Sequence, residues 1–122
     1  MTYGASAYQQ AARTVEAPRD REAALLSRAA ASLQRVQEEW PNNFDQLESA
    51  LTFNRKLWTV FMTSATREEN PLPVALRQNI TNLGMFVMNE TREMLLEPRP
   101  QRLGALINLN RQLADGLRNR AA

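Results

Sequence analysis

The chain has 122 residues, a formal net charge of +2 and 43% hydrophobic residues. It contains no cysteine and no histidine, which excludes disulfides, thiolate nucleophiles, metal sites built on these ligands and the usual general base at neutral pH. With only four glycines and no β-branched alternating runs, it is predicted to form one all-α domain over residues 1–122, an antiparallel helical bundle of about four long helices plus a short N-terminal helix.

The short helix is predicted over residues 3–14. Tyr8, Ala12 and Val15 recur at helical spacing on one side of this region. A helix of this length is not stable alone in water, so we expect it to dock either on the rest of the bundle or on another chain. Tyr8 is therefore a candidate partner-binding residue.

The second helix is predicted over residues 18–39, because Pro18 fits a first helical turn, where its missing N–H costs nothing. Its inner face is predicted to consist of apolar side chains at helical spacing, namely Leu25, Leu26, Ala29, Leu33 and Val36. Pro41 ends this helix. Trp40 beside it is a candidate contact residue, because helix ends often leave one edge of an indole ring exposed.

The third helix is predicted to start at an N-cap supplied by Asn42 and Asn43 and to end within residues 63–66. It carries the most continuous apolar stripe of the chain, which is Phe44, Leu47, Leu51, Trp58 and Phe61. Asn54 falls in the middle of this stripe. A buried amide costs stability unless it is hydrogen-bonded, so Asn54 is expected either to fix helix register or to be kept for a partner.

The fourth helix is predicted to begin near Pro73 and to end at residues 97–100, after the longest polar connection in the chain. Its inner stripe is predicted to be Leu76, Ile80, Leu83, Val87 and Met94. Met85 and Met88 flank Phe86 on the same helix. These methionines either fill gaps in the core or belong to a surface that grips a helix of another protein.

The fifth helix, predicted over residues 101–117, repeats the stripe with a central asparagine: Leu103, Leu106, Asn110, Leu113 and Leu117. We expect Asn54 and Asn110 to be buried on facing helices and hydrogen-bonded, with Arg55 and Arg111 each one step nearer the rim. These four residues and Trp58, which is either core or contact, complete the candidate partner-binding set. Short connections favour antiparallel packing between sequential helices.

No catalytic, cofactor or metal site is predicted. Glu38 and Glu39 would point about 100° apart on a helix, and Glu68 and Glu69 fall in a predicted loop. Lys56 is expected to be exposed, and the isolated glycines form no phosphate-binding loop. Without an apolar run long enough to cross a bilayer or a signal-like start, we expect a cytoplasmic protein with no membrane partner.

Most arginines of the chain are interleaved with acids at helical spacing, which is typical of a solvated helix face. The exception is the C-terminal part, where a single acid, Asp115, faces Arg99, Arg102, Arg111, Arg118 and Arg120. No aromatic residue interleaves with these arginines, so nucleic acid is not expected as a direct partner, although contact with RNA stays an alternative.

Short blocks over nearly the whole chain carry a further signal. They are residues 7–12 (AYQQAA), Pro18-Arg19, Trp40, Ala50-Leu51, Asn54-Arg55, Leu57-Trp58, residues 70–73 (NPLP) before Leu76-Arg77, Asn79-Ile80, Leu106-Ile107 and Asn110-Arg111. In this order and spacing they resemble the FlaF family of flagellar biosynthesis regulators. The resemblance is a pattern of many positions and includes no catalytic motif.

The resemblance implies a protein of alphaproteobacterial flagellar systems that promotes the synthesis and export of flagellin. FlaF-like proteins are expected to bind flagellin in the cytoplasm and to work opposite the FlbT regulator, which restrains flagellin translation. This role is similar to that of the helical flagellin chaperone FliS, which prevents early polymerisation. Flagellin is therefore the expected partner, with FlbT as a second candidate.

Two alternatives remain open on the residues alone. One is a post-transcriptional regulator that contacts flagellin mRNA or FlbT through the arginine-rich C-terminal helix. The other is a subunit whose exposed stripe closes a homodimer. The resemblance does not identify which residues contact flagellin.

Overall fold

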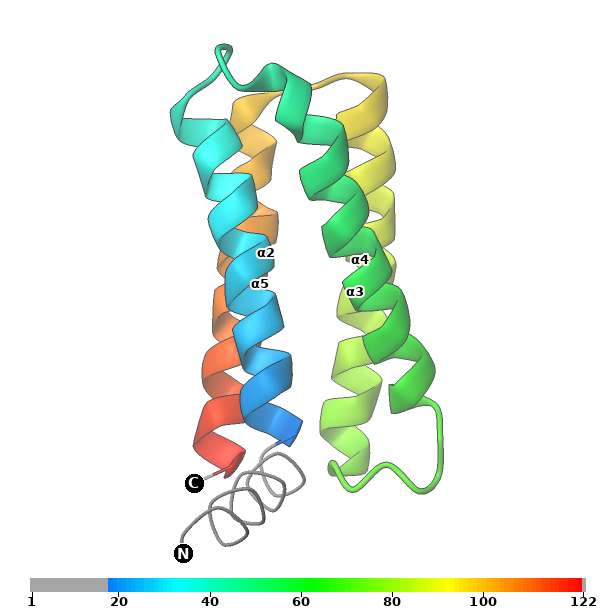
Figure 1. Cartoon of the computed structure of the whole chain (residues 1–122). Helices are drawn as coiled ribbons and strands as arrows, with labels where there is room; N and C mark the ends of the chain where they lie inside the picture. Colours follow the sequence, from blue (N-terminus) through cyan, green and yellow to red (C-terminus); the bar gives the residue numbers. More distant parts are fainter. Residues whose placement is uncertain (1–17, 122) are drawn as a thin grey trace, which may run out of the picture.

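The computed structural model describes residues 18–121 (Figure 1). Four α-helices follow one another, α2 (Pro18–Glu38), α3 (Leu47–Ala65), α4 (Val74–Leu96) and α5 (Pro100–Ala121), with one 3₁₀ turn, η1 (Phe44–Gln46), before α3. Residues 18–121 contain no strand, and the prediction of an all-α bundle is confirmed. The predicted short helix over residues 3–14, including Tyr8, lies outside the described part of the chain.

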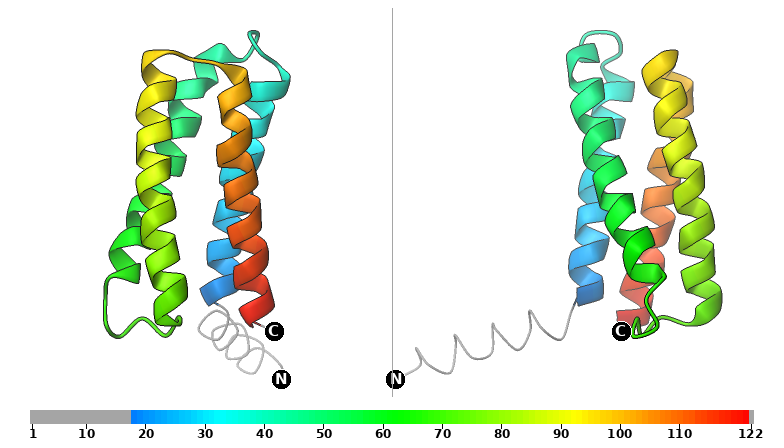
Figure 2. Two further views of the ribbon diagram at one scale, coloured as in Figure 1. Left: turned by 180° about the vertical axis from the view of Figure 1, so that it is seen from behind. Right: turned by 90° about the vertical axis from the view of Figure 1, so that its right-hand side faces the viewer.

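Each helix runs antiparallel to the next in sequence (Figures 1 and 2). The bundle consists of two tightly packed pairs, α2 with α5 and α3 with α4, and contacts between α2 and α3 join the pairs. In contrast, α4 and α5 touch little, although only residues 97–99 connect them. The expectation that sequential neighbours pack together is therefore wrong for this pair, since α5 packs mainly on α2.

The core follows most of the predicted apolar stripes. All five stripe residues of α5 are buried, as are Ile80, Val87 and Met94 of α4. On α2 the prediction is wrong at Leu25, which is 39% exposed. The prediction is right for Leu26, which is fully buried, because adjacent residues on a helix point about 100° apart.

The start of the third helix differs from the prediction. Asn43 makes no side-chain cap hydrogen bond, and α3 begins at Leu47, after η1. Phe44 is 46% exposed, and its ring meets the Trp40 ring edge-on with 5.2 Å between centroids. Because a 3₁₀ turn advances by about 120° per residue, Phe44 falls out of phase with the apolar stripe of α3.

Two side chains, Asn70 in the connection from α3 to α4 and Arg77 in the first turn of α4, hydrogen-bond to carbonyl oxygens of the α3 end and the loop. Asn70 Nδ2 donates to the Ser64 carbonyl oxygen at 3.1 Å. The Arg77 guanidinium donates to the carbonyl oxygens of Leu72 at 3.2 Å and Arg67 at 2.9 Å. These bonds satisfy backbone acceptors that the end of α3 and the loop leave free.

A glycine allows α3 and α4 to approach closely. A Cβ atom at Gly84 would lie 2.3 Å from both Cγ and Sδ of Met62 on α3. Any side chain at this position would therefore require the half-buried Met62 side chain to shift.

Candidate functional site

Two buried asparagines meet in the centre of the bundle. Asn54 on α3 and Asn110 on α5 are both fully buried, which confirms the prediction that they lie inside facing helices. Asn110 Nδ2 donates to Asn54 Oδ1 at 2.7 Å, and Trp58 Nε1 donates to Asn110 Oδ1 at 2.9 Å. A longer contact of 3.5 Å joins Asn110 Nδ2 to the carbonyl oxygen of Leu26 on α2. The asparagine network thus links three helices.

The indole of Trp58 fixes the direction of every hydrogen bond in the asparagine network. An indole N–H only donates, so the Asn110 atom that faces it is the amide oxygen. The Asn110 amide nitrogen then points at Asn54, whose facing atom must be the oxygen. Asn54 Nδ2 is left as a buried donor with no partner in the described structure. The prediction of satisfied amides is therefore right for Asn110 and wrong for this one atom of Asn54.

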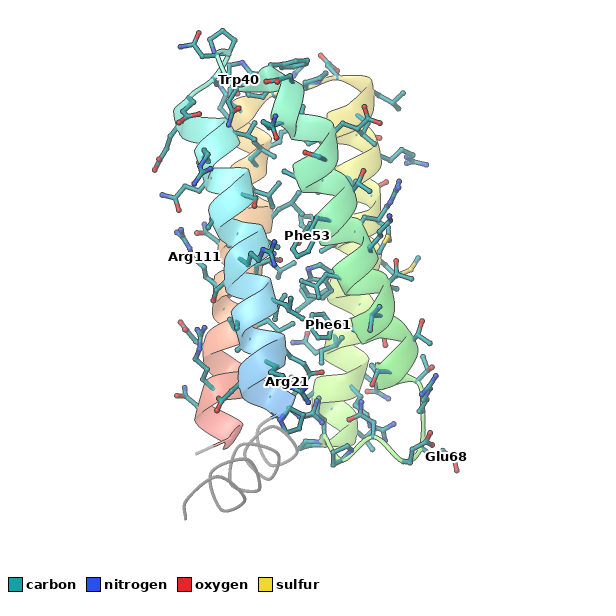
Figure 3. The ribbon with its side chains drawn as sticks, in the orientation of Figure 1. Arg21, Trp40, Phe53, Phe61, Glu68 and Arg111 are labelled. Atoms are coloured by element: carbon teal, nitrogen blue, oxygen red, sulfur yellow. The ribbon has the colours of Figure 1, made fainter. Side chains whose placement is uncertain are left out.

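The two arginines that follow the asparagines are exposed, as expected. Arg111 lies on the outside of the α2–α5 pair, where its guanidinium donates to the side-chain oxygen of Gln34 on α2 (Figure 3). Arg55 lies on α3. These two side chains are accessible to a partner, whereas Asn54 and Asn110 are not.

The remaining candidates fall into separate regions. Trp40 is half-buried at the end of the bundle where α2 turns towards α3 (Figure 3), Met85 is 62% exposed on α4, and Met88 is half-buried. Trp58 is fully buried. A partner can contact Asn54, Trp58 and Asn110 only if the bundle opens. Any role of these three residues in binding is therefore indirect, through their effect on the structure of the bundle. The binding roles of all these residues remain predictions.

An apolar groove, which the sequence reasoning missed, lies between α4 and α5. Its volume is about 330 Å³, and it is lined by Leu76, Asn79, Leu83, Leu109, Gln112, Leu113, Gly116 and Leu117. Figure 2 (left) shows the two helices side by side on the face turned towards the viewer. Leu109 is an apolar residue outside the predicted stripe of α5, but its spacing alone does not show that it lines a groove. We call this surface the α4–α5 groove.

Comparison with known families assigns the chain. The family model described as flagellar protein FlaF matches residues 4–117, which include α2, α3, α4 and most of α5. The chain belongs to the FlaF family. No curated protein and no solved structure gave a match.

A hollow of about 590 Å³ with a largely polar lining lies between the end of α2 and the start of α3 of this FlaF-family protein. Its lining is Ser32, Arg35, Glu39, Asn43, Gln46, Ser49, Ala50 and Phe53. Phe53 and Phe61 point from α3 towards α2 (Figure 3), and the Arg28 guanidinium lies 5.6 Å from the centroid of the Phe53 ring. Within residues 18–121, no group of three acidic side chains converges to hold a metal ion.

Several C-terminal arginines of this FlaF-family chain are engaged by acids. Arg102 on α5 bonds to Glu90 on α4 at 3.0 Å, and this hydrogen bond raises the pKa of the Arg102 guanidinium. The hydrogen bond from Arg99 lowers the pKa of the Glu97 carboxyl.

None of the described helices is long and apolar enough to cross a membrane.

Proposed function

We propose that this FlaF-family protein is a regulator of flagellar biosynthesis that binds flagellin in the cytoplasm, like a secretion chaperone, and has no enzymatic role. The observation that carries the proposal is the α4–α5 groove, an apolar surface between two helices of the bundle. Flagellin as the partner comes from the family, since membership in FlaF identifies a flagellar protein.

The proposed mechanism is capture of an amphipathic helix. Such a helix lays apolar side chains at i, i+3, i+4 and i+7 into a groove, here against Leu83, Leu109 and Leu113. The amides of Asn79 and Gln112 are exposed at the rim and can hydrogen-bond the polar flank of the bound helix. A flagellin helix held in this way is shielded from premature assembly and stays available for export.

The charge distribution favours protein capture over RNA contact. Arg102 is paired with Glu90, and Arg118 lies 3.8 Å from Asp115 and donates to Ser27 at 3.0 Å. Arginines engaged in this way contribute less to phosphate binding. The lining of the α4–α5 groove contains no charged side chain, so binding there depends little on salt.

The test is calorimetric titration of purified flagellin into the full chain at about 0.1 M and about 0.5 M salt. We expect a complex at both concentrations, with affinity reduced at least about 10-fold by Leu109→Glu in the groove and unchanged by Val60→Glu. Val60, on α3, is 64% exposed and is the matched control. Leu109 is half-buried, so circular dichroism must first show that Leu109→Glu is folded.

Two results would contradict the proposal. One is sequence-selective binding to flagellin leader RNA with no measurable affinity for flagellin, which supports the post-transcriptional alternative. The other is a complex that dissociates at about 0.5 M salt, because phosphate-like or ionic contacts weaken steeply with salt whereas apolar capture does not. Binding of FlbT in the same titration would identify the second candidate partner.

A further inference from the structure

A row of three arginines follows α2 on the side that faces α3. Arg21, Arg28 and Arg35 are seven residues apart, so their side chains leave α2 in nearly the same direction. The Arg28 guanidinium lies 5.6 Å from the centroid of the Phe53 ring on α3, and Arg35 lines the polar hollow between the two helices. Arg21 lies on the same side, near the lower end of α2 in Figure 3. The row therefore borders the junction of α2 with α3 over about 21 Å.

No carboxylate of the described chain lies within ion-pair distance of this arginine row. All three guanidinium groups are exposed, and the ion pairs within residues 18–121 involve other basic residues. Glu22, near the start of α2, is held by Arg19 at 2.6 Å. Glu39 shares the hollow with Arg35 but makes no ion pair with it. The row thus presents positive charges at steps of about 10.5 Å that no described acid neutralises.

Apolar side chains lie beside the arginine row. Leu25, three residues before Arg28 and so in the same row of α2, is 39% exposed. On α3, Phe53 and Phe61 point towards α2 (Figure 3), and Leu57 falls midway between them at helical spacing. Phe53 and Leu57 are half-buried, so both keep part of their apolar surface accessible. We call this surface, with the arginine row, the α2–α3 face.

The charge of the α2–α3 face is one-sided. On its α3 border Lys56 lines a shallow depression together with Asp45 and Glu48, so the charges there are mixed. Only the α2 border is uniformly positive. The α2–α3 face lies on the opposite side of the bundle from the α4–α5 groove, as the front view in Figure 1 and the rear view in Figure 2 show.

We propose that the α2–α3 face binds an amphipathic helix of another protein that carries acidic side chains seven residues apart along one flank of its apolar face. Such a helix, lying along α2, repeats its acids every 10.5 Å or so and matches the arginine row, as flanking charges do in a coiled coil. Its apolar side chains pack on Leu25, Phe53 and Leu57. Guanidinium groups suit this role because they bind carboxylates in a bidentate manner.

The apolar part of the α2–α3 face favours a protein helix over RNA. Phosphates would use the arginines but gain nothing from Leu25 and Leu57. Bases of a single strand stack on accessible aromatic rings, whereas the Phe53 ring is half-buried with the Arg28 guanidinium close to it. The inference does not rest on flagellin binding, and a helix on this face leaves the α4–α5 groove accessible to a second partner.

The test uses a synthetic helical peptide of about 18 residues, which spans about 27 Å and covers the arginine row. It has leucines at i, i+3, i+4 and i+7 and a glutamate at every seventh position on one flank. A second peptide has lysine in place of each glutamate. Fluorescence anisotropy with the full chain at low salt is expected to show binding of the glutamate peptide at least about 10-fold tighter than that of the lysine peptide. Equal affinities, or no saturable binding of the glutamate peptide, overturn the proposal.

A charge reversal locates the binding. Arg21→Glu/Arg35→Glu is expected to weaken the glutamate peptide at least about 10-fold and to strengthen the lysine peptide. The matched control is Arg55→Glu/Arg67→Glu, which changes the net charge equally. Arg55 is two residues after Phe53, about 200° round α3, and Arg67 lies in the connection to α4. Equal losses in the two double variants mean a non-specific charge effect and refute the proposed site.

The apolar contribution is tested at about 0.5 M salt, where ionic contacts are weakened. Leu25→Gln is expected to lower the remaining affinity for the glutamate peptide about 3-fold or more, and Leu96→Gln, at a 75% exposed position on α4, is expected to leave it unchanged. Circular dichroism checks that each variant is folded. No loss in Leu25→Gln contradicts packing of the helix on this face.

Two other ligands serve as competitors, a single-stranded RNA of about 15 nucleotides and vesicles of anionic phosphatidylglycerol. We expect neither to displace the glutamate peptide. If either binds more tightly than the peptide and loses this binding in Arg21→Glu/Arg35→Glu, the face recognises phosphate and the proposal of a protein helix is wrong.

Discussion

Replacing Asn110 by leucine is expected to destabilise the bundle far more than replacing Asn54, although both side chains are fully buried in one network. Asn110→Leu removes the acceptor of the Trp58 N–H and the donor to the Asn54 oxygen. Both groups then lack partners, in addition to Asn54 Nδ2. Asn54→Leu instead removes the unpaired donor and deprives Asn110 Nδ2 of its shorter hydrogen bond.

The size of the difference follows from counting stranded groups. A buried polar group without a partner costs about 1–3 kcal/mol, so Asn110→Leu loses about 2–6 kcal/mol of stability from its two newly stranded groups. In Asn54→Leu one group is stranded and one is removed, and these terms nearly cancel. Each variant gains a similar leucine and a similar volume change, which cancel in the comparison. The two variants are therefore expected to differ by about 2–6 kcal/mol.

The assay is urea unfolding followed by circular dichroism, with both single variants and the double variant Asn54→Leu/Asn110→Leu. The double variant is expected to be more stable than Asn110→Leu alone, because no Asn54 amide remains to be stranded. If Asn54→Leu and Asn110→Leu agree within about 0.5 kcal/mol, the hydrogen-bond directions deduced from the indole are wrong.

Three further predictions concern other parts of the bundle. Gly84→Ala should lower stability by about 1–3 kcal/mol in thermal unfolding, because the new methyl group collides with Met62, and Gly104→Ala, whose nearest neighbour is 3.7 Å away, should be neutral or stabilising. Arg102→Gln should lower stability slightly at low salt, and the difference from the unmodified chain should shrink at about 0.5 M salt; an undiminished difference would rule out a mainly ionic contribution. Asn54→Leu should fold and discriminate less between partner helices; a raised melting temperature with unchanged flagellin binding would show that the amide does not fix register.

The helices and most of the core could be predicted from the sequence because both depend on local patterns. Proline positions and the 3.6-residue period locate α2, α4 and α5 to within a few residues at each end. The errors at Leu25 and Phe44 arise where one residue decides a helical phase, by a 100° step in α2 and by a 3₁₀ turn before α3. The 3.6-residue period of apolar residues does not by itself determine which of two adjacent residues faces the core.

The candidate site was less predictable, because it depends on which helices pair. The sequence indicated that Asn54 and Asn110 would be buried, but the direction of their hydrogen bonds requires the position of Trp58. The α4–α5 groove exists because α5 packs on α2 and leaves its neighbour in sequence loosely packed. An apolar residue at position 109 is compatible with α5 packing on either α2 or α4. Its exposure to a groove could therefore not be deduced from spacing.

The pairing of the first described helix with the last has a consequence during synthesis on the ribosome. Ser27 on α2 receives its hydrogen bond from Arg118 on α5, 91 residues later. At a translation rate of about 5–20 residues per second, α5 is synthesised several seconds after α2, and the apolar face of α2 is without this partner helix for that time. During that time Leu26 and Leu33 have no packing partner from α5, so a chain that stalls before Pro100 exposes the apolar surface that chaperones and proteases recognise.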